Sequence, residues 1–135
     1  MLLIFNVALF SHQLEVIDLT ITVTNIKTLK GNIEIGLFNK IKSFPIKGKE
    51  YKTYSKRVTN NTMIITLKDI PKGYYAISVY HDINSDKKCN RNFFGIPVEP
   101  YGFSKNYRTR ISKPPINNCR INANKYMSIT IELIN

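Results

Sequence analysis

Cysteine is scarce in this sequence, which has only Cys89 and Cys119 among its 135 residues. Two cysteines so far apart are too few for a zinc site of the usual thiolate type. In an exported protein they are compatible with one disulfide, which would close a loop of about 30 residues and contribute roughly 3 to 4 kcal/mol. Two unpaired thiols are equally compatible, because spacing along the chain does not show whether the two Cα atoms approach each other.

Long apolar runs are missing, and no stretch approaches the roughly 20 residues that a membrane-spanning helix needs. The only sustained apolar segment runs from Leu2 to Phe10 and is followed by three polar residues. An apolar run of this length, followed directly by polar residues, is typical of a secretory signal peptide. We therefore predict a signal peptide over residues 1–11 and a single domain over residues 12–135. A buried first strand is the alternative, because no Lys or Arg precedes the run.

Acidic residues are few, since nine Asp and Glu stand against 20 Lys and Arg and leave a net charge of +11. Such an excess attracts anionic partners without specifying them. The partners we expect are an anionic glycan or a cell-envelope protein. We do not expect nucleic acid, because no RNP, zinc-finger or helix-turn-helix pattern occurs. The densest basic group, between Lys40 and Arg57, is best explained as exposed lysines that protect a sheet edge.

The motifs of common catalytic sites are also missing. The sequence contains no GxSxG, HExxH, P-loop or CxxC pattern, and these are the arrangements that position nucleophiles, metal ligands, phosphates or redox thiols. We therefore expect no enzymatic activity.

The sequence does contain apolar alternation with a period of two, the pattern of half-buried strands. The alternating runs are Leu19–Ile21–Val23, Ile33–Ile35–Leu37, Met63–Ile65–Leu67, Tyr75–Ile77–Val79 and Met127–Ile129–Ile131–Leu133. A polar edge strand is predicted from Lys52 to Val58, a short strand from Cys119 to Ala123, and a tight connection over residues 69–73. The pattern predicts an all-β fold, an antiparallel two-sheet sandwich of about seven strands. A small closed barrel is the alternative.

One long segment, residues 82–118, lacks a strand pattern and is rich in Asn, Lys, Pro and Gly. Connections of that length in compact domains are usually functional. The segment begins with Asp82, Asn84 and Asp86 at alternate positions, which is the spacing of calcium-binding loops. The carbonyl of Lys88 and the side chain of Asn90 would complete the ligand set, and calcium is the one cofactor that we consider.

Three positions of this loop depart from the calcium pattern. Lys87 stands where such loops have Gly, Asn90 offers an amide in place of a carboxylate, and Phe93 stands where they have a bidentate Glu. Glu99 could replace the missing carboxylate only if the chain folds back. The alternative is a loop held by local side-chain hydrogen bonds without a metal.

A second group of candidates surrounds this loop. The candidate ligand-binding residues are His81, Phe94, Glu99, Tyr101 and Phe103. The aromatic rings would either stack on a sugar or peptide or cap the open end of the sandwich. A small metal-dependent hydrolase using His81, Asp82 and Asp86 is the alternative function, and it requires these groups to converge in one pocket.

The chain also resembles a family of secreted bacterial proteins, domain of unknown function 2141 (DUF2141). The resemblance is carried by Val79-Tyr80-His81-Asp82 and by residues 92–106, with Gly95-Ile96-Pro97, Glu99 and Tyr101-Gly102-Phe103-Ser104. It implies export and an immunoglobulin-like or prealbumin-like sandwich, without an established activity. We therefore expect a non-catalytic binding or structural module of the bacterial cell envelope. Its location would be extracytoplasmic, whether periplasmic, on the outer surface or secreted.

Overall fold

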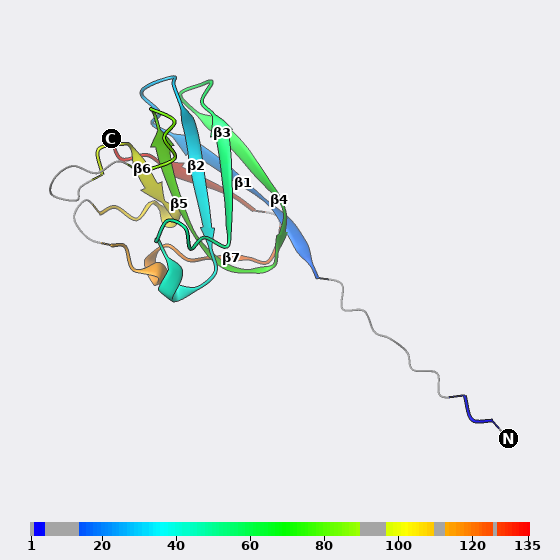
Figure 1. Cartoon of the computed structure of the whole chain (residues 1–135). Helices are drawn as coiled ribbons and strands as arrows, with labels where there is room; N and C mark the ends of the chain where they lie inside the picture. The colour runs from blue at the N-terminus through cyan, green and yellow to red at the C-terminus, as the bar shows by residue number, and fades with distance from the viewer. Residues whose placement is uncertain (1, 5–13, 90–96, 110–112, 126) are drawn as a thin grey trace.

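The computed structural model describes residues 2–4, 14–89, 97–109, 113–125 and 127–135 (Figure 1). In these ranges the chain is all-β, as the alternation predicts, with short 3-10 turns and no α-helix. The strands are β1 (Val16–Thr24), β2 (Asn32–Phe38), β3 (Lys52–Arg57), β4 (Met63–Pro71), β5 (Gly73–Asp82), β6 (Tyr101–Phe103), β7 (Ile121–Ala123) and β8 (Met127–Glu132). The 3-10 turns are η1 (Ile41–Ser43), η2 (Ser104–Asn106) and η3 (Ile116–Asn118).

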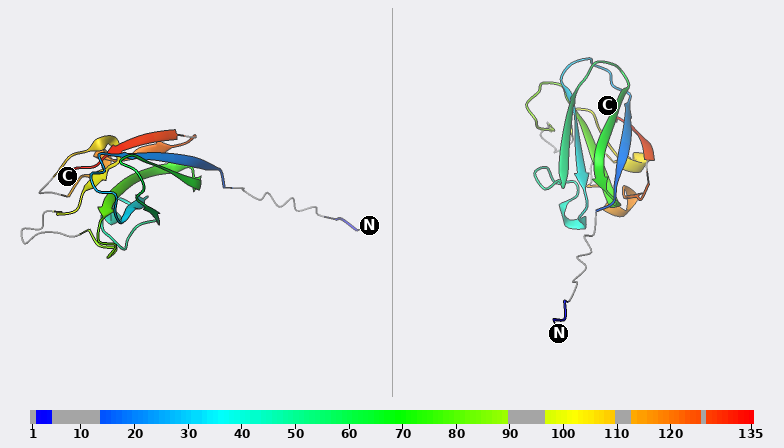
Figure 2. Two further views of the ribbon diagram at one scale, coloured as in Figure 1. Left: turned by 90° about the horizontal axis from the view of Figure 1, so that it is seen from above. Right: turned by 90° about the vertical axis from the view of Figure 1, so that its right-hand side faces the viewer.

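The strands form two layers (Figure 2). One sheet has the order β4-β1-β8, and the other has the order β3-β2-β5-β6, with β7 paired to the beginning of β5. Between the described strands all pairs are antiparallel except β1 with β8, which run parallel. The two sheets are thus mostly antiparallel, as predicted, with one parallel pair that the sequence did not predict. This pair arises because the chain leaves β7 in one sheet and crosses to the other before β8, and such a crossover allows a parallel neighbour.

The main core lies between the two sheets and follows the predicted alternation. Leu19, Ile21 and Val23 of β1 have no exposed surface, and neither do Ile33 and Leu37 of β2. The intervening side chains point away from the core because successive residues of a strand face opposite sides. The apolar periodicity therefore determined which face of each strand became buried.

The predicted connection over residues 69–73 is shorter in the structure, because β4 continues to Pro71 and β5 begins at Gly73, so only Lys72 lies between strands of different sheets. The strand before it, β4, pairs with β1, whereas the strand after it, β5, pairs with β2, β6 and β7. The turn therefore carries the chain from one layer to the other. The polar strand β3 lies at an edge of the larger sheet, as predicted, and its only residue that is not exposed is Tyr54.

A second hydrophobic cluster packs on the outer face of the larger sheet. Its buried members are Phe38, Phe44, Ala76, Tyr101, Phe103, Ile116, Cys119 and Ile134. Tyr101 and Phe103 of this cluster belong to β6, a short strand that the sequence did not predict. The buried hydroxyl of Ser104 anchors this cluster, because it accepts a hydrogen bond from the Ile77 N–H at 2.9 Å and donates one to the Cys119 carbonyl. Part of the long segment after β5 is thus structural.

The two cysteines are not joined by a disulfide. Cys119 has no exposed surface, and burial raises the pKa of its thiol to about 11, although nearby Lys105 acts in the opposite direction. The thiolate is the reactive form, so the folded protein should protect Cys119 from alkylation.

We expect iodoacetamide at pH 8 to label Cys119 at the rate of global unfolding, and to label it at once in denaturant. Mass spectrometry of digested protein gives the site-resolved rates. Deprotonation is harder in the folded state, so the contribution of this thiol to stability is complete near neutral pH and declines as the pH rises toward 11. Rapid labelling of Cys119 under native conditions would contradict its burial.

The described part of the predicted signal peptide lies outside the core. Leu2, Leu3 and Ile4 are 91%, 76% and 79% exposed. The rest of that apolar run falls outside the described residues. None of the described segments forms a helix with the length and apolar character required to cross a membrane.

Candidate cation-binding site

The candidate site begins where β5 ends. In the register of β2 with β5, Ile33 lies opposite His81 and Asn32 lies opposite Asp82. His81 therefore shares the core-facing side of β5 with Val79, and Asp82 shares the outer side with Tyr80. Both His81 and Asp82 have no exposed surface. The end of a central strand thus places a buried carboxyl group on the outer face of the larger sheet.

The loop after β5 wraps around the Asp82 carboxylate. Its Oδ1 accepts the Asp86 N–H at 3.1 Å and its Oδ2 accepts the Lys87 N–H at 2.7 Å. Ser85 and Lys87 adopt left-handed backbone conformations, with φ of 56° and 60°. Lys87 therefore takes the conformation for which calcium loops usually employ Gly. The first half of the loop has the turn geometry that the Asp-x-Asn-x-Asp spacing predicts.

Asp86 is held by its neighbours in the same loop. The Lys88 N–H donates to Asp86 Oδ1 at 2.9 Å, and the Asn84 amide donates to Asp86 Oδ2 at 3.2 Å. Asn84 Oδ1 lies 3.4 Å from the Asp86 N–H. The side chain of Asp86 is exposed, unlike that of Asp82. Asn84 and Lys88 thus contribute by orienting Asp86.

The chain does fold back to bring Glu99 to this loop. Glu99 is only 7% exposed, and its Oε2 accepts the Ile83 N–H at 2.8 Å. The return is held by the His81 N–H, which donates to the Pro100 carbonyl at 2.8 Å, and by the pairing of β5 with β6. Glu99 therefore reaches the loop because β6, which no sequence pattern revealed, pairs with β5.

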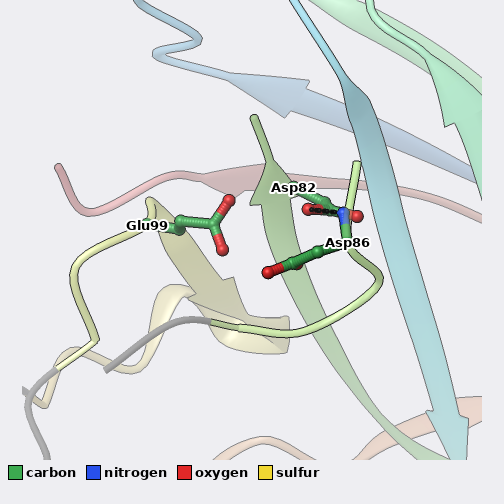
Figure 3. Close-up of side chains that lie close together, drawn as sticks. All are labelled: Asp82, Asp86 and Glu99. Carbon is green, nitrogen blue, oxygen red and sulfur yellow. Dashed lines mark hydrogen bonds between the residues drawn. The ribbon is translucent and has the colours of Figure 1, made fainter. Parts of the chain in front are cut away.

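Three carboxylates consequently face one another (Figure 3). One oxygen from each of Asp82, Asp86 and Glu99 lies within 4.8 Å of the others. Like charges at such distances repel, and burial of Asp82 and Glu99 adds a desolvation cost. The loop N–H groups offset part of that cost. A hard cation with oxygen ligands would offset the remainder, because carboxylate oxygens are the preferred ligands of calcium.

His81 does not join this group. Its Nε2 lies 2.6 Å from the Lys30 carbonyl in the loop between β1 and β2, so Nε2 is the nitrogen that carries a proton. Its Nδ1 is buried, and no hydrogen-bond partner for it occurs in the described part of the chain. The side chain of His81 thus braces the β1–β2 loop, while its main chain holds the return segment.

The other predicted ligand-binding residues have different surroundings. Tyr101 and Phe103 are 7% and 9% exposed and belong to the second hydrophobic cluster. The Tyr101 hydroxyl donates to the Thr109 carbonyl. Both rings therefore pack within the cluster on the outer face of the larger sheet, and their stacking on a ligand stays a prediction. Asn90 and Phe94 lie outside the described residues.

A bacterial family profile, described as "uncharacterized protein conserved in bacteria (DUF2141)", matches residues 21–130. The chain belongs to the DUF2141 family. The DUF2141 match begins within β1 and ends within β8, so it includes all three carboxylates of the candidate site. No curated protein and no solved structure matches the chain. The comparison with immunoglobulin-like and prealbumin-like folds therefore remains a prediction.

Proposed function

We propose that the chain is a non-catalytic, exported binding module of the bacterial cell envelope, and that Asp82, Asp86 and Glu99 bind a calcium ion. The observation that carries the proposal is the convergence of three carboxylates from two separate segments. It occurs in a protein with only nine acidic residues and a net charge of +11. Acidic side chains that are rare elsewhere in the chain are concentrated at one point.

The chemistry of the group favours calcium over zinc. All the side-chain donors are oxygens, and calcium accepts six to eight such ligands in flexible geometry. Zinc favours nitrogen and sulfur, whereas neither a histidine nor a cysteine of the described residues belongs to this group of carboxylates. Calcium-binding modules outside the cell typically have a Kd of about 10⁻⁴ to 10⁻³ M. That range suits an exported protein.

The proposed role of the ion is to connect two segments. Asp82 and Asp86 belong to the turn after β5, whereas Glu99 precedes β6. An ion bound by all three would hold both ends of the connection between these strands. The turn after β5 and the described segment before β6 would then be held together as a contact surface, which is the function of a binding module.

The arrangement supports a non-catalytic role. A metal-dependent hydrolase built on His81, Asp82 and Asp86 requires all three side chains in one pocket. His81 and Asp82 are adjacent in β5 and face opposite sides of the sheet. Asp82 and Asp86 lie together, whereas the His81 side chain contacts the Lys30 carbonyl instead of this pair.

Calcium titration of the purified chain tests the proposal. At a calcium concentration of 100 times Kd, binding to the folded state alone adds about 2.7 kcal/mol of stability. We expect this to raise Tm by about 10 °C. The rise should disappear when a chelator is added. It should also be lost in Asp86→Asn, which keeps the shape of an exposed side chain and removes one charge.

Asp69→Asn is the matched control. Asp69 is exposed and lies in β4, outside the acidic group, and its left-handed backbone (φ of 57°) is one that Asn tolerates. This variant should retain the full calcium effect. A wild-type Tm that is indifferent to calcium would overturn the cation proposal, and equal losses in both variants would show nonspecific counter-ion binding.

A further inference from the structure

A second, separate feature lies on the outer face of the larger sheet. It is a hollow of about 270 Å³. Pairing of β3 with β2 and of β2 with β5 places Ser55, Glu34 and Tyr80 in one row across the sheet. The polar residues that line the hollow are Glu34, Lys47, Thr53, Ser55, Tyr80 and Lys87. Three strands and two loops therefore contribute to one depression, which is also lined by Ile35 and Tyr54.

The hollow contains both charges and hydroxyl groups. Lys47 Nζ donates to the Tyr80 hydroxyl at 2.9 Å and lies 5.0 Å from the centroid of the ring. The Ser55 hydroxyl donates to Glu34 Oε1 at 2.7 Å. Burial, with a smaller effect from the charge of Glu34, raises the pKa of Tyr80, so its hydroxyl stays protonated and keeps a hydrogen to donate. Lys87 adds a second exposed ammonium group.

We propose that this hollow binds an acidic sugar, a ring that carries one carboxylate beside several hydroxyl groups. Lys47 and Lys87 would pair with the carboxylate, and Glu34 would accept hydrogen bonds from sugar hydroxyls. Ser55, Thr53 and Tyr80 would supply further hydroxyl contacts. Charge-assisted hydrogen bonds of this kind are the stronger class.

The mixture of charges distinguishes this ligand from simpler ones. An inorganic anion would be repelled by the negative Glu34 and would offer no hydrogen-bond donor to it beyond the one that Ser55 already supplies. A neutral sugar would leave both lysines without a counter-charge. A ligand with an anionic group and neighbouring hydroxyl donors complements both the two lysines and Glu34.

This inference goes beyond the cation site and does not depend on it. The two are nevertheless linked through Lys87, whose main-chain N–H donates to Asp82 while its side chain lines the hollow. An ion that holds the loop would also hold Lys87. Because such coupling is reciprocal, calcium and sugar should strengthen each other's binding.

Trigalacturonic acid is a suitable probe, and its fully methyl-esterified form is the matched neutral ligand. Binding is measured by NMR titration of the purified chain at low salt with a chelator present. We expect the acid to bind and to weaken as salt rises, because exposed charges are screened. The ester should bind at least about tenfold more weakly. Sodium sulfate at the same concentration should produce no shift at the hollow.

Three variants, each checked for an unchanged Tm, make the test specific. Lys47→Gln and Glu34→Gln should each weaken binding about tenfold. Lys56→Gln removes an exposed lysine of β3 that does not line the hollow, and it should have little effect. The response of Glu34→Gln is decisive, because simple attraction of an anion by positive charge would make this variant bind more tightly.

Three results would overturn the proposal: no binding of the acid, tighter binding by Glu34→Gln, or equal weakening by Lys56→Gln and Lys47→Gln. Because the titration is done without free calcium, its failure leaves the cation proposal untouched. Conversely, a calcium-insensitive Tm would leave the sugar result untouched.

Discussion

Replacing Gly31 with Ala is expected to lower the free energy of unfolding by at least about 3 kcal/mol. A Cβ atom at this position would lie 1.9 Å from the Asp82 carbonyl oxygen and 2.8 Å from Ile83 Cα. Both neighbours are main-chain atoms, so the end of β5 would have to move. The positive φ of 69° adds backbone strain for any residue with a side chain. Urea denaturation measures the loss.

Gly48→Ala separates the two causes. Gly48 also has a positive φ, of 92°, but a Cβ atom at this position would meet no other atom within 4 Å, so only strain should act. We expect a loss of about 1 to 2 kcal/mol for this control. Equal losses in the two variants would mean that the close approach of Gly31 to Asp82 is unimportant. Gly31→Ala should also reduce the Tm response to calcium, because it displaces the main chain of Asp82.

Truncating Phe103 to Ala should lower the free energy of unfolding by about 3 to 5 kcal/mol, the usual cost of removing a buried aromatic ring. The Phe103 ring lies 5.9 Å from the Phe44 ring and 5.9 Å from the Tyr101 ring, measured between centroids. Phe44 contacts Phe38 in turn at 5.3 Å. Phe103 is thus in the middle of a row of edge-to-face contacts. Phe103→Leu should recover much of the stability by refilling the space.

Tyr74→Ala is the control for Phe103→Ala. Tyr74 is 57% exposed, and Arg120 lies 5.1 Å from the centroid of its ring. We expect it to cost about 1 kcal/mol or less. If Phe103→Ala kept wild-type stability and lost a binding partner, the ring would be a contact residue and its assignment to the second cluster would be wrong.

Much of the fold could be predicted because apolar alternation is a local signal. The alternation of Leu19, Ile21 and Val23 with polar residues indicates which face of the strand is buried, whichever strand lies beside it. The same reasoning located β2, β4, β5 and β8. It failed for β6, because Tyr101-Gly102-Phe103 is too short to show a period and lies among Pro and Gly residues.

The candidate site was predicted in part for the same reason. Asp82, Asn84 and Asp86 lie within five residues, so their spacing is visible in the sequence. Glu99 reaches them only through the pairing of β6 with β5, a contact between distant segments. His81 looked equivalent to Asp82 because the two are adjacent, yet the strand places them on opposite faces.

Residue order along the chain was therefore enough to specify an all-β domain, the buried face of each long strand, the exposed edge strand and the turn around Asp82. These features depend on interactions within a few residues. The parallel pairing of β1 with β8, the return of Glu99 and the row of Ser55, Glu34 and Tyr80 depend on which strands become neighbours. That choice is made by packing of the two sheets as a whole, because many pairings satisfy the same local alternation and only one buries all the apolar faces together.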